Sequence, residues 1–393
     1  MDDGMKRATI ARIRSMLRMP DLFLEEAGIL LGDRSRARRR SCRRAAESLM
    51  LGKLAQNGNV AGLQWMLWYI DDLRLNASPF PCETPLIMAC QNDEVECARL
   101  LLAAGAAVDG QATGTGWTAL MEACAHGSVE CVRLLLSFRA DAQMRDADGV
   151  TALHTACQWG HADCLSLLLE ALRDELHAAD ARDLEGKTPL MVACAFGHDD
   201  CARLLVASGQ LRTVDACIHA ASSPFLEEHG RTALHYAALN GHAACVCVLL
   251  GAEAIDDVAC EQGGTPLAIA ASRGSVECVG ALSGRASPRM LEDALRRAAV
   301  HGHAETSIVL LRAGARWTTA HGALAEGGAM PVIRLACEPW SPANHYLFPA
   351  PHRRRAWELL KIGVQLSRLG PEWQPLLDAW LDHLMPCAIR REV

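Results

Sequence analysis

Apolar residues occur along this chain as pairs of short runs, and the pairs recur at intervals of 33 to 44 residues. In the first run a Leu, an Ala and a Cys or Ala follow at one-turn spacing, which predicts a short helix with a thin apolar face. The second run is rich in Val and Cys and ends in Leu-Leu, which predicts a helix with a broader apolar stripe. A turn separates the two runs. The pattern therefore predicts an all-α chain built from repeated helix pairs.

Six copies of the pattern align without gaps on one threonine. These threonines are Thr84, Thr118, Thr151, Thr188, Thr232 and Thr265. Pro or Ala follows each Thr, a combination typical of a helix N-cap and first turn. Weaker copies extend the array at both ends, over Leu49–Leu67, Asp293–Arg312 and Thr319–Leu335.

The aligned segments resemble the ankyrin repeat, whose pattern runs Gly-x-Thr-Pro-Leu-His-x-Ala-Ala, then Gly-His, then Leu-Leu. The resemblance covers residues 45–337. It implies an all-α ankyrin-repeat solenoid of about eight repeats, each a β-turn followed by two antiparallel helices. Two longer intervals place extra residues near 170–181 and 212–225. These insertions are either binding loops or neutral decoration.

Residues 1–44 form a basic N-terminal extension. Seven arginines crowd its end: Arg34, Arg36, Arg38, Arg39, Arg40, Arg43 and Arg44. Such a tract is either a solvated tail or a patch for nuclear localisation or an anionic surface. No aromatic residue is interleaved among the arginines, so we do not expect nucleic-acid binding.

The other end of the chain differs in composition. Residues 338–351 are rich in proline and predict a linker, and residues 352–386 predict a pair of helices. One interpretation is that this pair caps the solenoid. The alternative is a docking module, like the ubiquitin-ligase-binding box that some ankyrin proteins carry at this end, although no convincing match to that box is present.

The 17 cysteines invite a search for a metal or redox site. Ten of them fall six or thirteen residues after the repeat threonine, positions at which Cys serves as a small apolar residue. Paired spacings such as Cys-x-x-Cys are absent, so we expect no metal site and no cofactor. Cys42, which lies among arginines, is the candidate for a reactive thiol. The chain also lacks common nucleotide-binding, nucleophile-elbow and zinc-protease motifs, so we expect no enzymatic activity.

Charge, hydropathy and thiol content indicate where in the cell the protein is expected. The formal net charge is −7, with a pI of about 6.1. The 21-residue stretch Thr232–Ala252 is uncharged, but His235, Asn240 and His242 make it a poor membrane span. Many thiols in a long chain favour a reducing compartment, the cytoplasm or the nucleus. We expect a monomer.

The resemblance also implies where a partner binds. Ankyrin proteins meet their partners on a concave face made of turn tips and first helices. The candidate partner-binding residues on that face are Trp117, His126, Gln158, Trp159, Lys187, Phe196, Arg231, Asn240 and Arg273. We expect Trp117, Trp159 and Phe196 to form one aromatic patch, which either binds a partner or is covered by a tail or the 212–225 loop.

The sequence thus predicts a non-catalytic protein-interaction scaffold. Two alternatives stay open: a substrate adaptor of a ubiquitin-ligase complex that uses residues 352–386, and a nuclear regulator that uses the arginine tract.

Overall fold

A computed structural model describes residues 48–69, 75–76, 83–175, 178–211, 214–218, 230–261 and 263–316. The arginine tract, Cys42, the weak copy at Thr319–Leu335, the proline-rich segment and the predicted C-terminal helix pair lie outside the described residues. Most of the 212–225 insertion lies outside them too.

The described helices fall into two compact units. Unit 1 holds Met1–Ala193 and Asp200–Arg212, and unit 2 holds Cys194–Asp199 and Thr213–Val393. The boundary passes through helix α11 (Pro189–Phe196) and the start of helix α12 (Asp199–Ala207).

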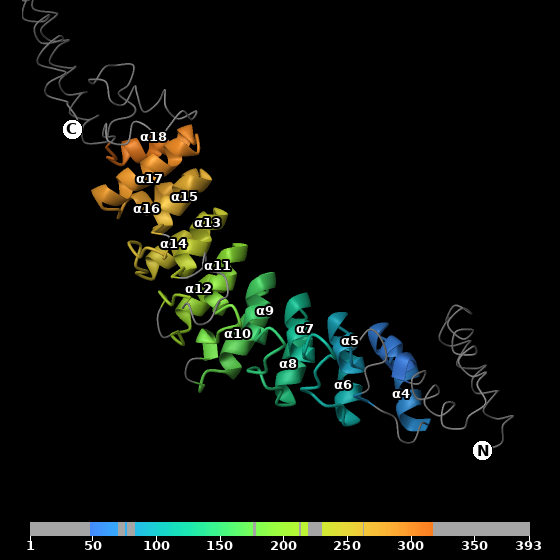
Figure 1. Ribbon diagram of the computed structural model, residues 1–393. Coiled ribbons are helices and arrows are strands. Elements are labelled where there is room, and N and C mark those ends of the chain that lie inside the picture. The colour runs from blue at the N-terminus through green and yellow to red at the C-terminus, as the bar shows by residue number, and fades with distance from the viewer. Residues whose placement is uncertain are drawn as a thin grey trace, which may run out of the picture. The chain divides into compact units, whose positions relative to one another are not determined.

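Unit 1 is built from helix pairs in two rows (Figure 1). Described helix in unit 1 begins with residues 48–56. The labelled helices wholly within unit 1 are α4 (Val60–Tyr69), α5 (Pro85–Gln91), α6 (Val95–Ala103), α7 (Ala119–His126), α8 (Val129–Ser137), α9 (Ala152–Trp159) and α10 (Ala162–Ala171), with the 3₁₀ turn η1 (Ala178–Asp180). In the pairs from α5 onward, the first helix directly follows the repeat threonine and the second helix comes after a turn. The first helices α5, α7 and α9 pack side by side, and the second helices α4, α6, α8 and α10 pack in the other row.

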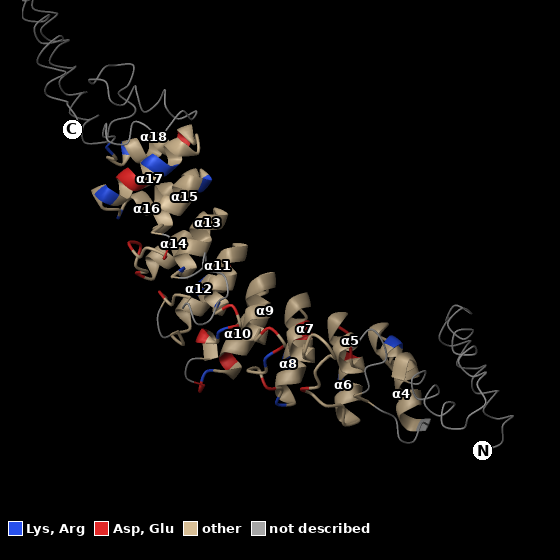
Figure 2. Cartoon of the chain, viewed as in Figure 1, with Lys and Arg blue, Asp and Glu red and all other residues tan. Residues whose placement is uncertain are grey.

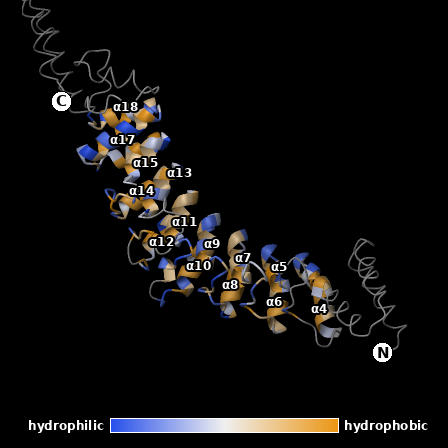
Figure 3. Cartoon of the chain, viewed as in Figure 1, coloured by the Kyte–Doolittle hydropathy of each residue, from blue (hydrophilic) through white to orange (hydrophobic). Residues whose placement is uncertain are grey.

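Unit 2 repeats this arrangement. Its helices are α13 (Ala233–Asn240), α14 (Ala243–Gly251), α15 (Pro266–Arg273), α16 (Val276–Ser283), α17 (Pro288–Val300) and α18 (Ala304–Arg312). The first helices α13, α15 and α17 pack in one row and the second helices α14, α16 and α18 in the other. Apolar residues concentrate on the helices (Figure 3). The predicted all-α fold of repeated helix pairs is confirmed.

The repeat threonines act as helix N-caps, as the sequence predicts. The Thr118 hydroxyl accepts a hydrogen bond from the Met121 amide at 3.3 Å, and the same contact recurs at Thr84, Thr188 and Thr265. Since a helix leaves its first amides without partners, each cap satisfies one of them.

Helix α17 shows where the sequence prediction fell short. The weak copy was expected from Asp293, whereas α17 begins at Pro288. The Ser287 hydroxyl caps it by accepting from the Met290 amide at 3.4 Å. Serine serves as the cap here, so the search for threonine missed the helix start.

A glycine and a histidine connect successive repeats. Gly127 ends α7 with φ +70°, a conformation that favours glycine. A Cβ added there would lie 2.6 Å from Nδ1 of His161 in the next repeat. The His161 Nε2 in turn lies 3.1 Å from the Ala125 carbonyl oxygen. The absent side chain of Gly127 therefore leaves room for the ring that links the two repeats.

The periodic cysteines are core residues. All ten are buried, and no disulfide joins the cysteines of the described part of the chain. Burial raises the pKa of Cys97 to about 11 and that of Cys124 well above its usual value. Thiols held protonated in this way behave as small apolar side chains.

Candidate functional site

The first helices expose the same position of the repeat to solvent in every copy. The residue eight after each repeat threonine is exposed in every copy, and we call these residues the exposed row. In unit 1 the row consists of Asn92, His126 and Trp159, and in unit 2 it consists of Phe196, Asn240 and Arg273. Each of these residues except Asn92 ends its first helix, where it does not serve the repeat's own core.

Two large aromatic side chains stand in this row. Trp159 at the end of α9 and Phe196 at the end of α11 are each 54% exposed. Trp117 lies at the turn tip before α7 and is half-buried, and its carbonyl oxygen accepts from the Ala112 amide at 2.8 Å. Trp117 and Trp159 belong to unit 1, whereas Phe196 belongs to unit 2. A single patch of all three remains a prediction.

The two predicted basic residues at turn tips are half-buried. The Lys187 ammonium pairs with the Glu185 carboxylate at 2.5 Å, and its carbonyl oxygen lies 3.1 Å from Nε2 of His154. Arg231 precedes α13, and its carbonyl oxygen accepts from the Ile218 amide at 3.1 Å. Both backbones thus hold their turns in place.

The remaining predicted residues differ in whether their polar side-chain groups make contacts within the protein. The Asn240 side-chain amide donates to the Ala195 carbonyl at 2.7 Å within unit 2. His126 lies with Nδ1 3.1 Å from the Glu122 carbonyl oxygen. Gln158 is half-buried, and Arg273 is exposed at the end of α15.

Two histidines that begin first helices are buried and structural. In α9, the Thr151 amide and hydroxyl both face Nδ1 of His154, at 3.3 and 2.9 Å. Nε2 of the same ring therefore carries the proton and donates to the Lys187 carbonyl. His235 makes the same contacts with Thr232 and the Gly264 carbonyl.

Burial, with a smaller contribution from the nearby charge of Arg145 or Arg231, lowers the pKa of His154 and of His235 to about 4. Both imidazoles are neutral at pH 7. Nδ1 of each ring accepts from its threonine N-cap, and Nε2 donates to a carbonyl of the next repeat, so both ring nitrogens are engaged inside the protein.

Two features were missed at the level of the sequence. Glu122 of α7 is an acidic residue that is only 7% exposed as a whole, at a position where the other repeats place uncharged side chains. That contrast between copies was the available signal. Trp68 of α4 is 87% exposed, whereas Leu63 and Met66 on the same helix are buried.

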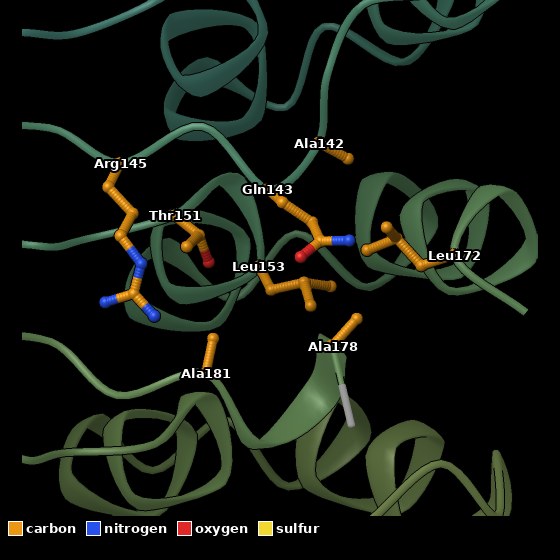
Figure 4. A pocket seen from close by; sticks show the side chains of 8 residues that line it. All are labelled: Ala142, Gln143, Arg145, Thr151, Leu153, Leu172, Ala178 and Ala181. Carbon is orange, nitrogen blue, oxygen red and sulfur yellow. The ribbon is translucent and has the colours of Figure 1, made fainter. Parts of the chain in front are cut away.

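A small pocket lies in unit 1 between the turn before α9, the end of α10 and η1 (Figure 4). Arg145, Gln143 and Thr151 line it together with apolar side chains such as Leu153 and Leu172. Its free volume of about 30 Å³ leaves room for water. The Arg145 guanidinium donates to the Arg182 carbonyl at 2.6 Å, which ties this turn to the next one.

The described residues offer neither a cluster of metal ligands nor a membrane-spanning helix. Among the described residues, no group of three or more His, Cys, Asp or Glu is placed to hold a metal ion. Within the same part of the chain, no helix combines the length and apolar character that a membrane crossing requires.

Comparisons with known proteins agree with this geometry. The family model described as ankyrin repeats (3 copies) matches residues 51–146, 136–215, 178–257 and 206–289. The human ASB11 ankyrin repeat domain is 30% identical, with a TM-score of 0.50, and the match covers 61% of this chain and 98% of that one. The ankyrin repeat domain of Bcl-3, a member of the IkappaB protein family, is 27% identical with a TM-score of 0.48, covering 58% and 97%. The search of curated proteins found no match.

Proposed function

This chain belongs to the ankyrin repeat family, and we propose that it is a non-catalytic scaffold that binds a protein segment. The repeats of this family generally serve protein–protein interaction. The bound segment lies along the turn tips and first helices. The exposed row supplies the contacts, with Trp159 and Phe196 as anchors. Trp117, His126, Gln158, Lys187, Arg231, Asn240 and Arg273 complete the surface. Binding then depends on a preformed surface rather than on bond chemistry.

The observation that carries the proposal is the exposure of Trp159 and Phe196. A side chain of this size that is 54% exposed leaves much apolar area in water. Burying an aromatic side chain of this kind is worth about 2 kcal/mol at an interface, and Trp is among the residues most often found as anchors. Neither residue is needed for the helix that it ends, because the equivalent position holds Asn, His or Arg in other repeats.

The test compares partners captured by the intact protein with those captured by a variant carrying Trp117→Ala, Trp159→Ala and Phe196→Ala. Circular dichroism first establishes that both are folded. A second variant, Trp68→Ala, removes an exposed aromatic residue from α4 and is the matched control. We expect partners to be lost with the triple change and kept with the control. Partners that persist with the triple change would refute the assignment of the surface.

The two alternative functions rest on residues outside the described part of the chain. Association of residues 352–386 with ligase subunits would support the ubiquitin-ligase adaptor. Loss of nuclear signal when the arginines between Arg34 and Arg44 are changed to alanine would support the nuclear regulator.

A further inference from the structure

Glu122 is exceptional among the first helices that follow a repeat threonine. In α5, α7, α9, α11, α13 and α15, all within the described part of the chain, the only Asp or Glu is Glu122. Figure 2 shows these helices almost free of charged residues, which gather instead in the turns, on second helices and on the first helix α17. Glu122 lies four residues after the repeat threonine, where the other copies have Met88, Thr155, Val192, Tyr236 and Ile269. The fold therefore does not require a charge at this position.

The carboxylate of Glu122 is buried without a strong cationic partner. Its side chain is only 9% exposed, and Oε1 lies 3.7 Å from Nδ1 of His126, which is half-exposed. Gln91, the last residue of α5, gives it a hydrogen bond. No Lys or Arg of the described residues pairs with it. A carboxylate is rarely buried to this extent unless it is paired.

The neighbouring elements do not add a compensating cation. Glu83, directly before the N-cap of α5, adds a second negative charge. On α8, Glu130 and Arg133 are exposed and pair with each other at 3.6 Å. The titratable side chains of α9 are His154, whose Nδ1 faces the Thr151 N-cap and whose Nε2 faces the Lys187 carbonyl, and the buried Cys157, a neutral thiol. Burial raises the pKa of Glu122, which His126 and Gln91 only partly offset.

We propose that Glu122 is the docking point for a basic side chain, preferably arginine, of the partner segment. This inference rests on the proposed function, since it names the chemistry of the partner that binds the same face. A planar guanidinium can meet both carboxylate oxygens at once and is more weakly hydrated than an ammonium group. It would provide the counter-charge that the fold itself omits.

The charge of the described part of unit 1 complements such a partner. Among its described residues, Asp and Glu are twice as numerous as Lys and Arg. A surface with this balance attracts basic segments over distances of about 10 Å at moderate salt. The long-range field would bring the segment to the surface, and Glu122 would fix its register there.

A selection of random twelve-residue peptides displayed on phage tests this proposal, with the full-length protein as bait. One selected peptide is then measured by calorimetry against the wild type, Glu122→Gln, Glu130→Gln and Trp159→Ala. Glu130→Gln is the matched control, because it makes the same chemical change in the same repeat on an exposed side chain of α8. Circular dichroism verifies that each variant is folded.

We expect arginine to be enriched at one peptide position. The peptide should bind Glu122→Gln at least tenfold more weakly than the wild type, and Glu130→Gln within about twofold. Changing that peptide arginine to Gln should abolish the difference between wild type and Glu122→Gln.

Peptides that need Trp159 but bind the wild type and Glu122→Gln equally would overturn this inference and leave the proposed function in place. Peptides whose binding ignores Trp159→Ala, or a selection that yields none, would overturn both.

Discussion

The buried histidines make the stability of this protein sensitive to acid in a calculable way. His154 and His235 have a pKa of about 4 in the folded chain, against about 6.5 for an exposed imidazole. Because the unfolded chain takes up protons more readily, the stability held above pH 6.5 is lost as the pH falls toward 4. The full difference corresponds to about 3 kcal/mol for each ring, and the part lost between pH 7 and pH 5 is about 2 kcal/mol.

The structural reason is the use of Nδ1 as an acceptor. In α9 the Thr151 amide and hydroxyl both face Nδ1 of His154. A proton at that nitrogen would oppose two donors and place a charge in a site that is 1% exposed. Protonation and capping therefore exclude each other.

The perturbation is His154→Gln, followed by urea unfolding at pH 7 and pH 5 at constant ionic strength. At pH 7 the variant should be less stable than the wild type by about 1 kcal/mol, because the cap is lost. Between pH 7 and pH 5 the wild type should lose about 2 kcal/mol of stability that the variant does not lose, because only the wild type carries this titrating ring. At pH 5 the difference in stability should therefore vanish or change sign. The comparison between variants cancels Glu122 and Asp183, whose raised pKa values act in the opposite direction.

Histidine ring signals in an NMR titration give a direct control. Two rings should titrate near pH 4, and His154→Gln should remove one of them. The reasoning would be refuted if the difference in unfolding free energy between wild type and variant were the same at pH 5 and pH 7. It would also be refuted if no histidine ring titrated below pH 5.

Three further changes have defined outcomes. Glu122→Gln should raise the free energy of unfolding by about 1 kcal/mol at pH 7. Because burial raises the pKa of Glu122, this gain in stability should shrink as the pH falls through that pKa. Urea unfolding at pH 4 and pH 7 measures the gain, and an equal gain at both pH values would contradict the prediction. Gly127→Ala should lower the stability of the fold by about 2 kcal/mol or more, because of the positive φ and the clash with His161. Gly105→Ala should lower it less, because Gly105 has a φ of +92° but open space around it. Equal losses of stability in thermal melts would contradict the role of His161. Thr118→Val should cost about 1 kcal/mol through the lost N-cap while Thr118→Ser should not, and equal unfolding midpoints for the two variants would count against the cap.

The parts of the fold that depend on local chemistry were predictable from the sequence. The threonine caps and the core cysteines recur at fixed positions, so each copy reinforces the interpretation of the others. Where the local signal changed, the prediction failed: α17 begins at a Ser-Pro pair five residues before the expected start.

The candidate surface was less accessible to sequence reasoning, because it depends on how repeats stack. Exposure of Trp159 follows from its place at the end of a first helix, and this was predictable. The amide of Asn240 donates to Ala195 forty-five residues away, and the burial of Glu122 depends on the helices packed around it. Contacts of this kind arise from neighbouring repeats and leave no mark within a single copy.

The central claim is that a protein segment binds along the first helices, and photo-crosslinking tests it most directly. A photoreactive phenylalanine analogue is placed at position 159, and in a second protein at Glu170, which is exposed on the second helix α10. The account predicts that cells yield a discrete crosslinked partner from position 159 and none from position 170. The same partner captured from position 170 but not from 159 would contradict it.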